Sequence, residues 1–430
     1  MSGLGGGSRC QTRRVGHRFG ESKALAERGL PGDRRHFAVR VSLLFAAVCT
    51  IAGTHLPYLP IWLDWVGLSA REIAVVVALP MVVRVIATPV IAFAADRSGD
   101  HRRFLFMLAC GALAAALVLG QCRNFWPILA LSLLFALGHT TMMPLTETVA
   151  MGGVRSAGLD YGRMRLWGSV SFIAASFGGG WALDRFGPPA AVWLLVGGAI
   201  LTALAAHSLP RSAATASHQA AAAGGRRRIG LADALALARS RFFLTFLLAV
   251  GAVQAAHAAF YTFGTLHWAA QGLSKGWSGT LWAIGVTVEI GLMAFSGAVV
   301  RRVGAARLIV IGAAVSVLRW LAMGFDPPFA ALIALQPLHG ITYGATHIGA
   351  FYLITRAVPE TQAGTAQALY AAVTAGIFMG GATLLSGQLY AAHGGRTYWA
   401  MAVVAGVGLV AAVALRRLRI GEPRRELLQG

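Results

Sequence analysis

LWAIGVTVEIGLMAFSGAVV, residues 281–300, is a run of twenty residues in which Glu289 is the one charged side chain. At about 1.5 Å per residue, a helix of this length crosses the roughly 30 Å hydrocarbon core of a bilayer. A charge at that depth costs about 2.5–3.5 kcal/mol even on mild insertion scales, so such residues face a cavity and a partner. The stretch therefore predicts a membrane span with a functional position inside it.

Similar runs recur along the whole chain. Of its 430 residues, 57% are hydrophobic and 12% are charged, against about a quarter charged in soluble proteins. No ten-residue alternation of apolar and polar residues appears, so a spanning β-barrel is not expected. We predict an all-α polytopic membrane protein with about twelve transmembrane helices, at 37–62, 71–95, 104–121, 125–150, 163–184, 189–209, 242–268, 277–300, 305–324, 328–355, 362–391 and 397–415.

The chain has a net charge of +21, and its basic residues are distributed in a regular way relative to the predicted spans. Basic residues gather in alternate loops, such as those with Arg97 and with Arg226, and the opposite loops hold few. By the positive-inside rule both termini are cytoplasmic, which predicts a multi-pass protein of a bacterial-type inner membrane. Because the basic residues alternate with spans, no nucleic-acid partner is expected.

One long polar connection divides the chain. RSAATASHQAAAAGGRRRIG begins at Arg211 and leaves six predicted spans on each side. The predicted parts are a basic, disordered N-terminus (1–36), a six-helix bundle (37–210), a cytoplasmic linker (211–240), a second bundle (241–418) and a tail (419–430). Gly99 and Gly304 follow spans two and eight, which favours a duplicated bundle. The N-terminal segment is also consistent with an upstream start codon, or with weak binding to anionic lipid.

Several motifs resemble a known family. AADRSGDHRR (94–103) resembles the Asp-Arg-x-Gly loop between spans two and three of the major facilitator superfamily, with Ala92 in place of that family's leading glycine. Over about residues 37–418, the stretches PLTETVA, DYGRMRLWGSVSF, AAHAAFYTFG, VEIGLMAF, VLRWLAMG and LHGITYGATHIGAF are similar to the bacterial 3-phenylpropionic acid transporter family, close to the lactose and nucleoside proton symporters. The resemblance implies two pseudo-symmetric six-helix bundles and secondary transport. Arg301 stands where the second-half loop would have an Asp.

Glu289, His257 and His339 lie roughly 16–18 Å deep, counted along their spans, and Arg319 lies roughly 8 Å deep with a side chain that reaches further. The set resembles the lactose-permease-like constellation, which implies proton coupling by Glu289, His339, Arg319 and His257. Those symporters carry a further acid on span ten, where this chain has His347. Two alternatives stay open: a fixed ion pair between Glu289 and Arg319, and histidines that bond backbone carbonyls.

The predicted substrate site combines both halves. Arg84 lies deep in the first half with no acid at its level, which favours an anionic cargo; alternatively it bonds backbone or pairs with Glu289. Three-residue spacing places Gln254 beside His257 and Gln336 beside His339. Aromatic residues such as Trp282 would stack on an aromatic acid, or else anchor the membrane interface. The predicted substrate-binding residues are Arg84, Gln254, His257, Gln336, His347 and Trp282.

The loop after span two is predicted to act as a gate. Gly99 permits a tight turn, and Asp96, beside Arg97, can cap a helix and pair with a basic residue of a neighbouring span. Asp160 is predicted to open span five in a similar way. None of these residues is expected to touch substrate.

The predicted function is proton-coupled uptake of a small organic anion, such as a phenylpropionate-like aromatic carboxylate. The alternatives are proton-driven efflux, sugar or nucleoside symport with protons, and a membrane sensor that transports nothing. No nucleophile motif, HExxH or ATP-binding loop appears, so the chain is not expected to be an enzyme. The four cysteines lack metal-like spacing, so we expect no cofactor and no metal. The expected partners are the anion, protons and the lipid bilayer, with the chain a monomer.

Overall fold

The structure is a computed structural model that describes residues 31–210, 237, 239–358 and 362–421. Most of the predicted N-terminal segment, the linker and the C-terminal tail lie outside the described residues. Within the described part every regular element is helical, and the predicted all-α class is confirmed.

The first half contains six long helices. They are α2 (Pro31–Trp65), α3 (Ala70–Ser98), α4 (His101–Leu119), α5 (Phe125–Ala157), α6 (Tyr161–Phe186) and α7 (Ala190–Ser208). Each coincides with one predicted span. The largest differences are that α2 begins at Pro31 instead of 37 and α5 continues to Ala157 instead of 150, because a helix need not end where its apolar run ends.

The second half also crosses six times, in broken segments. These are α10 (Arg241–Ala255) with α11 (Ala258–Ala270); α12 (Lys275–Ala294) with α13 (Ser296–Val303); α14 (Ala305–Met323); α15 (Phe329–Leu335), η1 (Gly340–Ala345) and α16 (Thr346–Ala357); α17 (Ala363–Ala371), η2 (Ala372–Phe378) and α18 (Met379–His393), followed by the short η3 (Gly394–Arg396); and α19 (Thr397–Gly421). The segments η1 and η2 are π-helical. Such turns widen a helix and are frequent at functional sites.

Twelve helical crossings are therefore present in the described residues, as predicted. Nine described stretches are long and apolar enough to span a membrane, and one of them, Thr365–Leu418, contains two crossings. The remaining two crossings are α6, which carries several polar residues, and the interrupted α15–η1–α16 segment.

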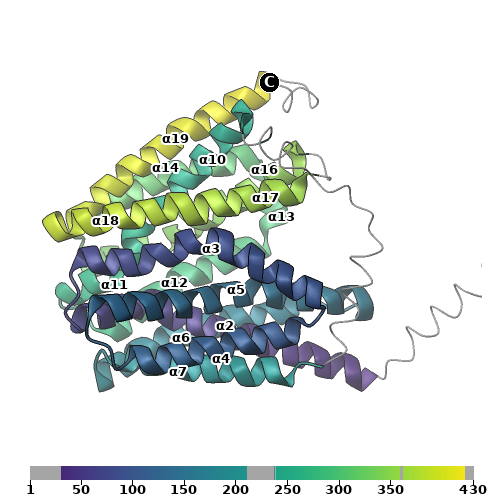
Figure 1. Cartoon of the computed structure of the whole chain (residues 1–430). Helices are drawn as coiled ribbons and strands as arrows, with labels where there is room; N and C mark the ends of the chain where they lie inside the picture. Colours follow the sequence, from purple (N-terminus) through teal and green to yellow (C-terminus); the bar gives the residue numbers. More distant parts are fainter. Residues whose placement is uncertain (1–30, 211–236, 238, 359–361, 422–430) are drawn as a thin grey trace, which may run out of the picture.

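The helices form two bundles (Figure 1). The buried core is divided accordingly: one apolar cluster belongs almost wholly to α2–α7, and two further clusters belong to the second half. Helix α3 packs on α18, and α6 packs on α12. A side chain at Gly387 would collide with Ala74 and Ala70, and one at Gly279 would collide with Ser176. Small residues thus allow the close approach of helices that lipid-embedded bundles depend on.

The end of the molecule that holds Phe186 and Lys275 is called the closed end below. Here the Asp184 carboxylate of α6 accepts hydrogen bonds from the backbone N–H groups of Lys275 (2.9 Å) and Gly276 (2.8 Å). These are the first N–H groups of α12, which lack partners within their own helix. The two halves are therefore joined at this end through a helix cap.

Candidate functional site

A polar cluster lies inside the second half, where the sequence predicted it. His339 Nε2 lies 3.2 Å from Glu289 Oε2. Arg319 Nη1 lies 3.4 Å from His339 Nδ1 and 3.3 Å from Thr342 Oγ1, and His257 Nε2 lies 3.0 Å from the same hydroxyl. The three residues predicted to share one level and Arg319, predicted to reach them with its side chain, thus form a continuous network, with Thr342 as a member that the sequence reasoning missed.

The contacts of His339 define its protonation. Arg319 can only donate, so His339 Nδ1 must accept, and Nε2 then carries the hydrogen that is donated to Glu289. One neutral tautomer satisfies both partners, whereas a doubly protonated ring would place a second N–H against the guanidinium. The neutral ring of His339 thus donates to the Glu289 carboxylate and accepts from Arg319.

Arg319 is fully buried. The alternative in which it forms a fixed ion pair with Glu289 is wrong. Glu289 instead contacts the imidazole of His339. The Arg319 guanidinium instead donates to Gln336 Oε1 at 3.2 Å and lies over the rings of Phe260 and Trp320, at 4.9 and 4.6 Å from their centroids. Two aromatic faces and one amide oxygen thus hold this cation in place of a carboxylate.

His257 occupies the break between α10 and α11. Its Nδ1 contacts the carbonyl oxygens of Val253 (3.0 Å) and Gln254 (3.2 Å), so the predicted backbone-bonding alternative describes this nitrogen. The Gln254 side chain points elsewhere and donates to Tyr370 Oη at 2.8 Å. The side chains of Gln254 and His257, expected to lie side by side, therefore form hydrogen bonds with different partners, Tyr370 and Thr342.

Tyr370 also contacts His347 Nδ1, at 3.2 Å. The ring of Tyr343 stacks on that of His339 and on that of His347, with centroids 5.6 and 6.3 Å apart. Sequence reasoning missed both tyrosines. Spacing could have revealed Tyr343, since residues 339, 343 and 347 follow one helix face at four-residue intervals.

Trp282 is buried and donates from Nε1 to Thr265 Oγ1 at 3.0 Å. Its ring stacks on Tyr261 with centroids 5.7 Å apart. The interface-anchor alternative is wrong for this residue. Trp282 supports Tyr261, which reaches a cavity of the first half.

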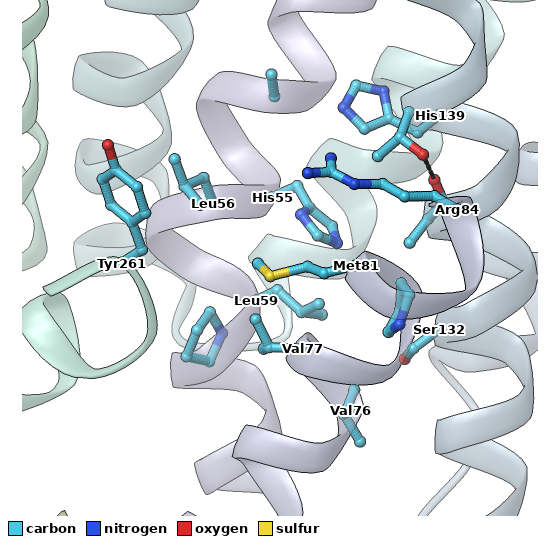
Figure 2. A pocket seen from close by; sticks show the side chains of 15 residues that line it. His55, Leu56, Leu59, Val76, Val77, Met81, Arg84, Ser132, His139 and Tyr261 are labelled. Carbon is cyan, nitrogen blue, oxygen red and sulfur yellow. Dashed lines mark hydrogen bonds between the residues drawn. The ribbon is translucent and has the colours of Figure 1, made fainter. Parts of the chain in front are cut away.

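That cavity has a volume of about 200 Å³ and lies between α2, α3 and α5, with Tyr261 of α11 on its remaining side (Figure 2). Most of its wall is apolar. Its polar side chains are Arg84, His55, His139, Ser132, Thr140 and Tyr261. The residues predicted to bind substrate are thus divided: Arg84 lines this cavity, and the others lie in the second-half network or, like Trp282, against it.

Arg84 joins the cavity to the other half. Its Nη2 donates to the carbonyl oxygen of Ala375, at 2.8 Å. Ala375 belongs to the π-helix η2, whose altered hydrogen-bond pattern leaves carbonyls available. Of the two alternatives given for Arg84, the hydrogen bond to backbone is therefore present, and the pairing with Glu289 is not. A guanidinium has five N–H groups, so donors remain for a ligand, and no carboxylate of the described residues forms an ion pair with Arg84.

His55 and His139 were missed by the sequence reasoning. Their ring centroids lie 6.1 Å apart, and Phe135 stacks on both, at 5.6 and 6.3 Å. The available signal was their placement inside apolar runs on two different spans, the same reasoning that selected His257. Together with Arg84 they give one end of the cavity three nitrogen-bearing side chains.

The predicted gate residues lie at the end of α3 opposite to the closed end. Gly99 ends α3 in the left-handed region (φ +68°), as its turn role requires. Asp96 Oδ1 lies 2.8 Å from His101 Nε2 on the next helix. The helix cap predicted for Asp96 is instead made by Asp100, which accepts from the N–H of Arg103, and Arg97 is exposed. Asp160 caps α6 as predicted.

Comparison with known proteins decides the family. Residues 39–401 match the family model described as the MFS_1 like family. The chain belongs to this family. It is 31% identical over 360 residues to a probable 3-phenylpropionic acid transporter of Escherichia coli (strain K12), covering 82% of this chain and 91% of that protein. It is 30% identical over 353 residues to a maltose permease of Geobacillus stearothermophilus, covering 78% and 84%.

Solved structures agree on the fold. A crystal structure of the nucleoside transporter NupG superposes with a TM-score of 0.74 at 18% identity, covering 90% of this chain and 100% of that one. A bacterial homologue of the human lysosomal transporter Spinster, in an inward-facing and unoccupied conformation, gives a TM-score of 0.71 at 11% identity, covering 90% and 98%. The predicted membership of the major facilitator superfamily and its fold are confirmed. The chain is a multi-pass secondary transporter of small molecules, and is not an enzyme.

Proposed function

We propose that this transporter takes up a small organic anion together with protons, and that its cargo is a phenylpropionate-like aromatic carboxylate. The observation that carries the proposal is Arg84: a guanidinium with free donors at the wall of a mostly apolar cavity. A carboxylate would satisfy the donors, and a ring would occupy the apolar part of the cavity. The relative named a probable 3-phenylpropionic acid transporter supports the same class of cargo.

The second-half network supplies the proposed coupling. Glu289 is only partly exposed, and moving it through a closed state is less costly when it is neutral. We assign proton binding to Glu289 with His339 as its hydrogen-bond donor, and we assign to Arg319 and His257 the task of holding that ring in place. Gln254, Gln336 and His347 are proposed to line the cargo's path, with Trp282 as support for Tyr261.

In this proposal the closed end faces the outside of a bacterial inner membrane and both termini are cytoplasmic, as the distribution of basic residues favours. The chain acts as a monomer. During its transport cycle the halves separate at Asp184 and come together at the opposite end, near Asp96, Arg97 and Gly99.

The test is uptake of radiolabelled 3-phenylpropionate into proteoliposomes. With an inward proton gradient the acid should accumulate, a protonophore should abolish the accumulation, and labelled maltose and uridine should not accumulate. Accumulation of either neutral compound in place of the acid would refute the anionic cargo. Loss of preloaded acid driven by the same gradient would identify the protein as an exporter.

A further inference from the structure

Two buried polar atoms of α5 have no hydrogen-bond partner in the described structure: Ser132 Oγ and His139 Nδ1. Both residues line the cavity of the first half, and at 2% and 9% exposure both are more than nine-tenths buried. The other hydroxyls of this helix behave differently. Those of Thr140, Thr146, Thr148 and Ser156 donate to the carbonyl four residues earlier, and that of Thr141 lies 3.3 Å from the hydroxyl of Thr88. Ser132 therefore lacks a bond that its own helix normally provides.

The two atoms belong to opposite ends of the cavity. Residues 132 and 139 are seven apart, so they share a helix face and are separated by about 10 Å along its axis. Figure 2 shows His139 beside Arg84 at one end, Ser132 at the other, and Leu59 and Met81 between them. The cavity thus has two polar ends and an apolar middle.

One carboxylate cannot serve both ends, because its oxygens lie much closer together than about 10 Å. A carboxylate placed on Arg84 would also accept from His139 Nδ1 in the tautomer that carries hydrogen there. Ser132 would remain without a partner. An unpaired buried hydroxyl is costly, and ligand pockets use a few placed polar groups of this kind to select their ligand.

We propose that the cargo carries two polar groups: a carboxylate at the Arg84 and His139 end, and a hydroxyl or similar hydrogen-bonding group that reaches Ser132. This inference rests on the proposed function and narrows it from aromatic acids in general to those with a polar substituent at the end away from the carboxylate. Ser132 is then a specificity-determining residue, while Arg84 holds any member of the class.

The experiment compares two probes, 3-phenylpropionate and 3-(4-hydroxyphenyl)propionate, by equilibrium binding to the purified transporter. The hydroxylated acid should bind about 5- to 150-fold more tightly, since one satisfied buried hydroxyl separates the two complexes. In Ser132→Ala the preference should disappear while the affinity for 3-phenylpropionate stays within about twofold. Thr148→Ala is the matched control, because it removes a hydroxyl of the same helix whose bond is satisfied at Pro144 and which lies outside the cavity lining.

Each of the other possible binding results would refute one part of the proposal. Equal affinities of the unaltered protein for the two acids would refute a cargo with two polar groups, but would not affect the proposal of anion uptake. A preference that survives Ser132→Ala would remove Ser132 from the site. Failure of both acids to bind would refute the proposed function itself. If Ser132→Ala does not fold, Ser132→Cys, with a weaker donor of similar size, should reduce the preference at least severalfold, and an unchanged preference would again remove Ser132.

Discussion

Replacing Asp184 by Asn should open the closed end. The carboxylate receives two backbone N–H groups of α12 across the boundary between halves, at 2.9 and 2.8 Å. Asn offers one acceptor oxygen and no charge, so one N–H loses its partner and the favourable interaction with the helix dipole is lost. Helix caps are worth about 0.5–2 kcal/mol. A loss of about 1–2 kcal/mol that is confined to the closed-end state would raise the relative population of the opposite state by about 5- to 30-fold.

Access to the cavity from the closed end measures this shift. Met81 lines the cavity, so Met81→Cys, in a chain whose cysteines at 10, 49, 110 and 122 have been replaced, gives a reporter. A membrane-impermeant maleimide added outside intact cells should label that cysteine about 5- to 30-fold faster in Asp184→Asn. The labelling rate is proportional to the population open to the outside.

Glu72→Gln is the control. Glu72 accepts from Ser69 N at 2.8 Å in the capping box of α3, so this variant weakens a cap at the same end of the molecule within a single half. Its labelling rate should match that of the parent. Equal labelling of parent and Asp184→Asn, or equal acceleration by both variants, would refute the assignment of Asp184 as a link that holds the halves closed.

Three further variants test the proposed roles. Arg84→Lys keeps the charge but loses the planar fork, so binding of 3-phenylpropionate should weaken about tenfold or more; an equal loss for a neutral amide analogue would show that Arg84 is structural. Glu289→Gln can still accept from His339, so it should fold and exchange cargo across the membrane without accumulating it, and retained proton-driven accumulation would exclude Glu289 as the carrier. Asp96→Asn weakens the contact with His101 and should slow transport several-fold with equilibrium binding unchanged; loss of binding in a normally inserted variant would argue against a gate.

The depth of the functional residues was predictable, whereas their partners were not. Glu289, His257 and His339 were placed at one level because rise per residue is nearly constant along any helix. Which residue contacts which depends on rotation about the helix axis, and the break at His257 and the π-helix η1 change that rotation locally. For this reason Glu289 pairs with His339 and not with Arg319.

The groups that join the two halves were likewise not predicted. Arg84 bonds the carbonyl of Ala375, which is 291 residues away in the sequence, and Asp184 bonds Lys275 and Gly276. Backbone groups are the partners in each case. A sequence shows which side chains are present, but it does not show which N–H and C=O groups a helix end or a π-turn leaves free.

Segment length and composition were enough to predict the all-α class and the twelve crossings, since insertion in lipid depends on these local properties. The quoted motifs were enough to predict the family. The folded arrangement was needed to show that Arg84 shares a cavity with His55, His139 and Ser132, and that the halves are joined at Asp184. These contacts join residues of different helices. Their geometry depends on how the bundles pack, because small residues and helix breaks set the distance and rotation of each helix relative to its neighbours.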